Sequence, residues 1–284
     1  MKKNLLYLAV ILLCVNLFVL FLFVYNRQTD TQPPVIHFAQ GQLEVSVGDP
    51  QSALLQGVTA QDQVDGDVTA SVVVAGVRLL QSDGTIQVTY AAFDHTGNAT
   101  RAVRTARYTD YESPRFQINS SMTFAANTEF DLFREVKARD QLDGDISHRV
   151  RSTSLDGQSV TAPGSHLVLL CVSNSLGETV ELEIPVEVYP AGTYGATLHL
   201  TDYLVYVPAG RQLSAESYLD SFVANGQPIS LAGGLPEGFS LEMKSNVKPE
   251  VPGVYTVEYR VTRQDEAGNN SGTGYAKLIV VVEG

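Results

Sequence analysis

The chain alternates hydrophobic and polar residues over most of its length beyond residue 30. The alternation is clearest in residues 85–90, 180–188 and 255–261, where every second residue is hydrophobic. A period of two is typical of a strand that buries one face, and turn-forming residues separate the runs. With about seven short strands in each repeat, this pattern favours antiparallel sheets packed as a β-sandwich. Residues 213–219 alone suggest one or two helical turns outside the N-terminal segment.

The N-terminal segment departs from this pattern, because residues 5–25 are hydrophobic apart from Asn16. At 1.5 Å per residue, a helix of this length reaches about 30 Å, the thickness of a hydrocarbon core. No Ala-x-Ala cleavage site follows the segment, and Lys2 and Lys3 precede it. We therefore predict an uncleaved signal anchor with a cytoplasmic stub over residues 1–27. The expected topology is single-pass, with a cytoplasmic N-terminus and extracytoplasmic repeats.

An acidic turn occurs twice, at residues 62–67 and 140–145, and each copy is followed by a Gly-led strand and a second turn. A third copy keeps the strand at 253–259 and the second turn at 265–269, but residues 225–228 stand where its acidic turn is expected. A period near 80 residues is long enough for a domain with its own core. The sequence thus predicts a linker at 28–34 and domains at 35–110, 114–190 and 194–284.

These motifs resemble the bacterial surface-protein Ig-like domain, a family also present in some insecticidal crystal proteins. The resemblance covers roughly residues 33–284 and is strongest as far as about residue 188. It is carried by the order Asp-x-x-Asp-Gly-Asp, Pro-Gly-x-Tyr-x-Val-x-Tyr and Asp-x-x-Gly-Asn. It implies an all-β protein of three tandem Ig-like antiparallel β-sandwiches, here after one predicted transmembrane helix, and it implies no enzymatic activity.

The net charge of the chain limits the classes of partner that it is expected to bind. The formal net charge is −12, and the first 27 residues carry three positive charges, which leaves −15 for the rest. An acidic exterior argues against nucleic acid as a partner.

The two cysteines, Cys14 and Cys171, lie in separate hydrophobic runs, so no disulfide is expected. We interpret Cys171 as a small buried hydrophobic residue.

The acidic turns are the candidate metal-binding residues: Asp62, Asp65 and Asp67 in the first copy, and Asp140, Asp143 and Asp145 in the second. Carboxylates this close together around a glycine can offer oxygen ligands to Ca²⁺. The alternative is a simple turn, in which Asp65 and Asp143 cap the backbone and the outer carboxylates are hydrated. We favour the simple turn. The sequence therefore predicts no cofactor and little change in melting temperature with millimolar Ca²⁺.

Catalytic motifs are absent from the sequence. The five histidines (His37, His95, His148, His166 and His199) are scattered, and no pair has metal-ligand spacing. We predict that the chain is not an enzyme. The favoured function is a membrane-anchored binding, adhesion or spacer module at the bacterial cell surface, with a protein or glycan partner in the envelope. The alternative is an envelope hydrolase or wall-modifying enzyme whose site lies in the divergent third domain.

Overall fold

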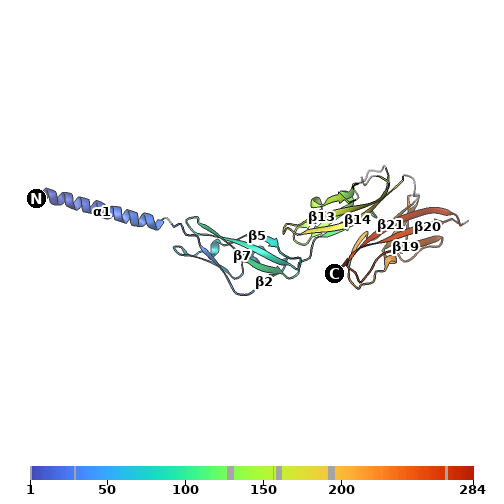
Figure 1. Ribbon diagram of the computed structural model, residues 1–284, viewed down its shortest axis with the longest axis horizontal. Coiled ribbons are helices and arrows are strands. Elements are labelled where there is room, and N and C mark those ends of the chain that lie inside the picture. The colour runs from blue at the N-terminus through green and yellow to red at the C-terminus, as the bar shows by residue number, and fades with distance from the viewer. Residues whose placement is uncertain are drawn as a thin grey trace. The chain divides into compact units, whose positions relative to one another are not determined.

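The computed structural model describes residues 2–28, 30–126, 131–155, 157, 162–190, 196–224, 226–265 and 268–284. The chain divides into two compact units, Met1–Tyr111 and Glu112–Gly284. The first unit holds the N-terminal helix α1 (Lys2–Gln28) and one β-sandwich, and the second unit holds two β-sandwiches (Figure 1).

The three sandwiches share one topology, in which a three-stranded sheet packs on a four-stranded sheet. In the first, the sheets are β1 (Val35–Phe38), β3 (Val58–Asp62) and β4 (Gly66–Asp67), and β2 (Leu43–Val45), β7 (Ala99–Tyr108), β6 (Thr85–Phe93) and β5 (Val73–Leu79). In the second, they are β11 (Gly144–Asp145), β10 (Val136–Asp140) and β8 (Arg115–Ile118), and β12 (Arg151–Ser154), β13 (Gly164–Ser173), β14 (Thr179–Tyr189) and β9 (Thr123–Ala125). In the third, they are β15 (Ala196–Leu200), β17 (Leu219–Ala224) and β18 (Gln227–Ser230), and β16 (Leu204–Pro208), β21 (Asn270–Glu283), β20 (Gly253–Gln264) and β19 (Phe239–Ser245).

Strand pairing is antiparallel except at one place in each sandwich, where an early strand pairs in parallel with the last strand. These pairs are β2–β7, β9–β14 and β16–β21. Short helices connect strands at Gln51–Leu55 (η1), Thr69–Ser71 (η2), Leu132–Glu135 (α2), Ser147–Arg149 (η3) and Ala215–Tyr218 (η4). The prediction of three tandem Ig-like antiparallel sandwiches is confirmed. The suggested helical turn at 213–219 is the four-residue η4.

The Gly-led strands place one buried residue at the same position of each sandwich: Tyr90 in β6, Leu170 in β13 and Tyr259 in β20. Each lies six residues after its glycine and is almost fully buried. The two tyrosine hydroxyls donate hydrogen bonds to helical carbonyls, Tyr90 to Leu54 O at 2.7 Å and Tyr259 to Ala215 O at 2.8 Å. Burial raises the pKa of both phenols. The predicted alternation of hydrophobic and polar residues therefore places these side chains in the cores of the sandwiches.

Replacing Tyr259 with phenylalanine is expected to lower the free energy of unfolding by about 1–2 kcal/mol, because Ala215 O loses its hydroxyl donor in a partly buried place. Urea denaturation of the full chain measures the change. Tyr255→Phe is the matched control, since its hydroxyl donates to Val251 O at an exposed site, and a loss below about 0.5 kcal/mol is expected there. Equal losses in the two variants would contradict the role of burial.

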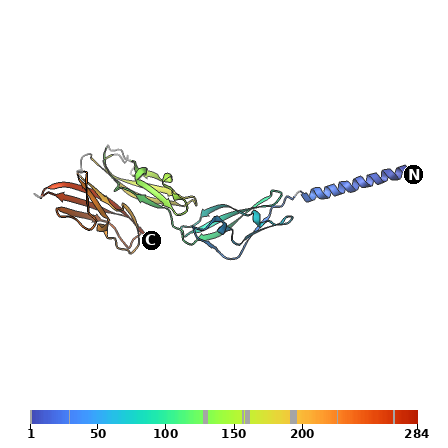
Figure 2. The same cartoon turned by 180° about the vertical axis from the view of Figure 1, so that it is seen from behind.

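The second and third sandwiches share one hydrophobic core cluster, which runs from Phe116 to Val282. Polar contacts join them as well. The buried Lys277 of β21 pairs with Glu187 of β14 and, at 3.2 Å, with Glu258 of β20. Arg115 of β8 pairs with Glu283 at 3.0 Å, and both Figures 1 and 2 show these two sandwiches side by side.

The predicted domain bounds stay predictions. The division into compact units separates residues 111 and 112, close to the first predicted boundary, and keeps the second and third sandwiches together. The predicted break between residues 190 and 194 touches positions outside the described residues.

The N-terminal helix forms as predicted, but the predicted membrane topology is corrected. Among the described residues, no helix is both long and apolar enough to cross a membrane. The side chains described in α1 are Tyr7 and residues 10–22, which are exposed. The lack of such a helix among the described residues overturns the predicted single-pass localisation, and membrane anchoring through residues 5–25 is not supported.

Candidate functional site

The first acidic turn connects β3 to β4 and is organised by its first carboxylate. Asp62 is 7% exposed, and its Oδ1 accepts hydrogen bonds from the N–H groups of Val64 and Asp65, at 2.7 and 2.8 Å. Gly66 follows with a φ of +78°, a conformation that glycine adopts without strain. The capping role therefore belongs to Asp62, whereas the sequence assigned it to Asp65. The other oxygen of Asp62, Oδ2, is buried and has no hydrogen-bond partner.

Asp65 faces the second turn of the same sandwich. Its Oδ2 accepts the N–H of His95 at 2.8 Å, and the His95 ring nitrogen Nδ1 lies 3.1 Å from the same oxygen. The imidazole itself is 81% exposed. Asp67 is exposed and accepts the N–H of Thr69 at 2.9 Å; hydrogen bonding to Thr69 lowers its pKa. Asp67 therefore lies outside the group that Asp62 and Asp65 begin.

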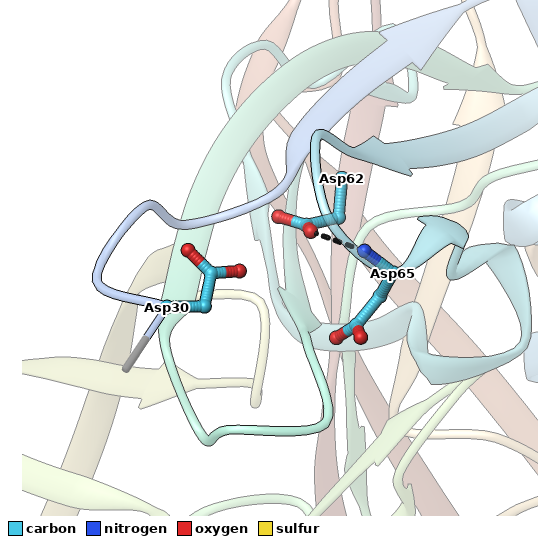
Figure 3. A group of neighbouring side chains, drawn as sticks. All are labelled: Asp30, Asp62 and Asp65. Carbon is cyan, nitrogen blue, oxygen red and sulfur yellow. Dashed lines mark hydrogen bonds between the residues drawn. The ribbon is translucent and has the colours of Figure 1, made fainter. Parts of the chain in front are cut away.

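A third carboxylate reaches the turn from the predicted linker. Asp30, Asp62 and Asp65 each place one oxygen within 4.8 Å of the others, and Figure 3 shows Asp30 approaching from a separate segment of the chain. The carbonyl of Asp30 accepts hydrogen bonds from Thr96 Oγ1 at 3.2 Å and Asn98 Nδ2 at 3.0 Å. Sequence reasoning missed Asp30, because the residue lies outside the repeat and no local pattern marks it.

The second acidic turn, between β10 and β11, has the same backbone but a different charge environment. Asp140 is buried, and its Oδ1 accepts the N–H groups of Leu142 and Asp143. Its Oδ2 accepts a hydrogen bond from Asn174 Nδ2 at 3.1 Å. Asp145 is exposed and is held by Ser147, whose hydrogen bonds lower its pKa.

The central carboxylate of that turn, Asp143, is paired with a cation. Arg149 NH1 lies 2.6 Å from its Oδ2, and Ser175 donates its N–H at 2.7 Å and its hydroxyl at 2.6 Å. Burial acts to raise the pKa of Asp143, but the hydrogen bonds from Ser175 and Arg149 outweigh it and hold the pKa below its usual value. No carboxylate corresponding to Asp30 joins this turn among the described residues.

Two substitutions between the repeats explain the difference. Arg149 is the last residue of η3, and Ser71 is the last residue of η2, at the same spacing from its acidic turn. Asn174 directly follows β13, whereas Asp94 directly follows β6. A carboxylate cannot donate a hydrogen bond when ionised, so Asp94 cannot satisfy Asp62 as Asn174 satisfies Asp140. The first turn is therefore short of both an amide donor and a cation.

A polar cleft of about 650 Å³ lies in the second unit, where β8 faces the segment that joins β15 to β16. Its exposed carboxylates are Asp202 and Asp220, which accept hydrogen bonds from the neighbouring hydroxyls of Thr201 and Ser221, respectively. The remaining lining residues are Arg115, Phe116, Gln117, Ile118, Asn119, His199, Leu200, Thr201, Tyr203, Leu204 and Tyr206.

Contacts among the residues that line the cleft hold several of their side chains in place. Tyr206 OH accepts the N–H of Phe116 at 3.0 Å, and the Arg115 guanidinium lies over the Tyr206 ring at 5.0 Å. Burial raises the pKa of Tyr206. His199 Nδ1 lies 3.4 Å from Tyr203 OH, and no carboxylate pairs with His199 among the described residues. Sequence reasoning missed this cleft, because its two walls come from different sandwiches.

His166 is buried with Nε2 at 2.7 Å from Ala162 O, while His148 is exposed. Cys14 is exposed and Cys171 is partly buried, and neither forms a disulfide.

Comparisons with known proteins give structural likeness at low similarity. No protein-family description and no curated protein sequence matches the chain. Among solved structures, protocadherin gammaB7 EC3-6 is 11% identical, with 89% of this chain and 74% of that chain covered and a TM-score of 0.20. The lipoprotein BT2262 from Bacteroides thetaiotaomicron is 10% identical, with 57% and 79% covered and a TM-score of 0.22. A Clostridium perfringens ZmpB fragment, CBM51-2 with GlcNAc and INT domains, is 13% identical, with 88% and 41% covered and a TM-score of 0.22.

These likenesses are too weak to carry an argument about function. The resemblance to the bacterial surface-protein Ig-like domain therefore stays a prediction at the level of the family, and the link to insecticidal crystal proteins is not confirmed.

Proposed function

We propose that this chain is a non-catalytic binding module of a bacterial surface protein, and that it binds a hydroxyl-rich glycan in the cleft of the second unit. The observation that carries the proposal is the polar lining of that cleft. Its volume falls in the range of ligand sites, roughly 300–1,000 Å³. Most such sites are apolar, whereas here the exposed groups are carboxylates, amides, a hydroxyl and the guanidinium of Arg115.

The charges in the cleft favour a neutral ligand with many hydroxyl donors. Arg115 is occupied by Glu283, so Asp202 and Asp220 dominate the exposed charge. Ionised carboxylates only accept hydrogen bonds, and sugar hydroxyls donate them. Gln117 and Asn119 are exposed on the opposite wall and supply both donors and acceptors. Phosphate-bearing ligands are disfavoured by the same carboxylates.

A peptide that adds as a strand is the runner-up ligand. β8 lies at an edge of its sheet, where such a peptide could pair. However, the N–H of Phe116 is already taken by Tyr206 OH, which removes a backbone donor from that edge. The glycan is therefore the better fit.

A catalytic role is the less favoured alternative. A nucleophile needs a base within hydrogen-bond reach and a third group that orients the base. In the cleft, His199 contacts a tyrosine, and Thr201 donates to Asp202. This arrangement supports binding more than hydrolysis, although a histidine and two carboxylates do converge near the third sandwich, where an enzyme site was the alternative expectation.

Co-sedimentation of the full chain with purified bacterial peptidoglycan and wall polysaccharide tests the proposal. The double variant Asp202→Ala/Asp220→Ala is expected to bind at least tenfold more weakly, since hydrogen bonds to charged groups contribute about 1.5–3 kcal/mol each. Glu216→Ala/Glu237→Ala is the matched control, because both glutamates are exposed on the third sandwich outside the cleft. Equal binding by both double variants would contradict the assignment of the cleft. Release of new reducing ends from the polysaccharide would favour the hydrolase.

A further inference from the structure

The first acidic turn holds a buried carboxylate oxygen that nothing in the described residues satisfies. Asp62 Oδ2 is inaccessible to solvent, accepts no hydrogen bond and faces the group formed with Asp30 and Asp65. Asp30 Oδ2 is also buried and without a partner. Burying an ionised carboxylate without compensation is costly, so a compensating cation is expected at this place.

The chain's own positive charge does not supply that compensation. Among the described residues, the ion-pair partner recorded for these three carboxylates is His95, which is exposed and lies against Asp65. The second acidic turn shows what a compensated version looks like, because Asn174 satisfies Asp140 and Arg149 pairs with Asp143. The backbone of the two turns is the same, so the missing partners are specific to the first turn.

We propose that Asp30, Asp62 and Asp65 form a single Ca²⁺ site in the first sandwich, and that the ion fastens the segment at Asp30 to the two turns of that sandwich. All three ligands are hard carboxylate oxygens, as Ca²⁺ prefers. Their ligand oxygens lie within 4.8 Å of one another, a spacing that bonds of 2.3–2.6 Å to one Ca²⁺ can span. Mg²⁺ usually keeps several waters and is bound through one or two carboxylates, so a group of three carboxylates favours Ca²⁺.

The site differs from the one the sequence indicated. Asp67 is replaced by Asp30, and the second turn with Asp140, Asp143 and Asp145 is excluded, because its charges are already balanced. The preferred simple-turn interpretation rested on a hydrated, screened cluster, whereas Asp62 is buried. The carbonyl contacts of Asp30 with Thr96 and Asn98 hold this residue near the turn, which reduces the ordering needed on binding. The proposal is independent of the glycan cleft in the second unit.

Calorimetric titration of the chelator-treated full chain with CaCl₂ tests the site, together with melting curves in CaCl₂, in MgCl₂ and in NaCl of equal ionic strength. One Ca²⁺ per chain is expected, with a rise of several degrees in melting temperature that NaCl does not reproduce and MgCl₂ reproduces less. Hydrogen exchange of peptides that cover residues 30–38 and 58–67 is expected to slow when Ca²⁺ is added.

Three variants separate the ligands from their neighbours. Asp30 lies outside every strand. Asp30→Ala is therefore expected to weaken Ca²⁺ binding at least tenfold while the far-ultraviolet circular dichroism of the chain stays unchanged. Asp67→Ala, in the same turn, and Asp143→Asn, at the matching position of the second turn, are expected to keep the binding and the stoichiometry. No heat of binding, a thermal shift equal to that in NaCl, two ions per chain, or unchanged binding in Asp30→Ala would each overturn the proposal.

Discussion

Replacing Gly84 with alanine is expected to lower the free energy of unfolding of the first sandwich by at least about 3 kcal/mol. Gly84 opens the strand that carries Tyr90 and has a φ of +88°. A Cβ at this position would lie 2.3 Å from the carbonyl oxygen of Tyr108. That oxygen belongs to the backbone, and Tyr108 N–H donates to Gly84 O at 2.9 Å, so the clash cannot be relieved without losing a strand contact.

Two costs add in this variant. An L-residue in the left-handed region costs roughly 1–2 kcal/mol. Forced overpacking costs typically about 1–3 kcal/mol more. Urea denaturation of the full chain, followed by hydrogen exchange of the peptides in β6 and β7, measures the loss where it occurs.

Gly97→Ala is the matched control for this prediction. Gly97 has a φ of +93°, but a Cβ there would meet nothing within 4 Å. This variant is expected to show only the conformational cost, roughly 1–2 kcal/mol. If both variants lose the same stability, the close approach of Gly84 to Tyr108 has no energetic consequence.

Replacing Phe222 with alanine is expected to lower the free energy of unfolding of the second unit by about 3–5 kcal/mol. Phe222 in β17 is fully buried and contacts the ring of Phe239 edge-on, with centroids 5.3 Å apart. Its ring also lies close to Gly272 and Gly274 of β21, where no side chain can move into the space left behind. The cavity should therefore remain largely open, which places the loss toward the upper end of that range.

Because the hydrophobic core is continuous between the second and third sandwiches, hydrogen exchange should quicken in β13 and β14 of the second sandwich as well as in β20 and β21. Phe133→Ala is the matched control, since Phe133 is 48% exposed and should lose less than about 1 kcal/mol. Faster exchange confined to the third sandwich would show that the two sandwiches unfold separately.

The predicted strands succeeded because their signal is local. Ile86, Val88 and Tyr90 alternate with polar residues, and the pleat of a strand turns that alternation directly into a buried and an exposed face. The Gly-containing turns succeeded for a similar reason, since Gly66 and Gly144 adopt the positive φ that few other residues tolerate. The structure overturned the single-pass topology that was predicted from the hydrophobic length of residues 5–25 and the charges flanking them.

The sequence by itself therefore determined the three-fold repeat, the all-β sandwich and the position of both acidic turns, because each follows from the spacing of neighbouring residues. Only the tertiary structure decided which carboxylates meet. Asp30 reaches Asp62 from more than thirty residues away, and Asn174 reaches Asp140 across a similar separation. Two turns with nearly identical sequences thus receive different partners, because burial and charge balance depend on side chains that folding brings together from distant segments.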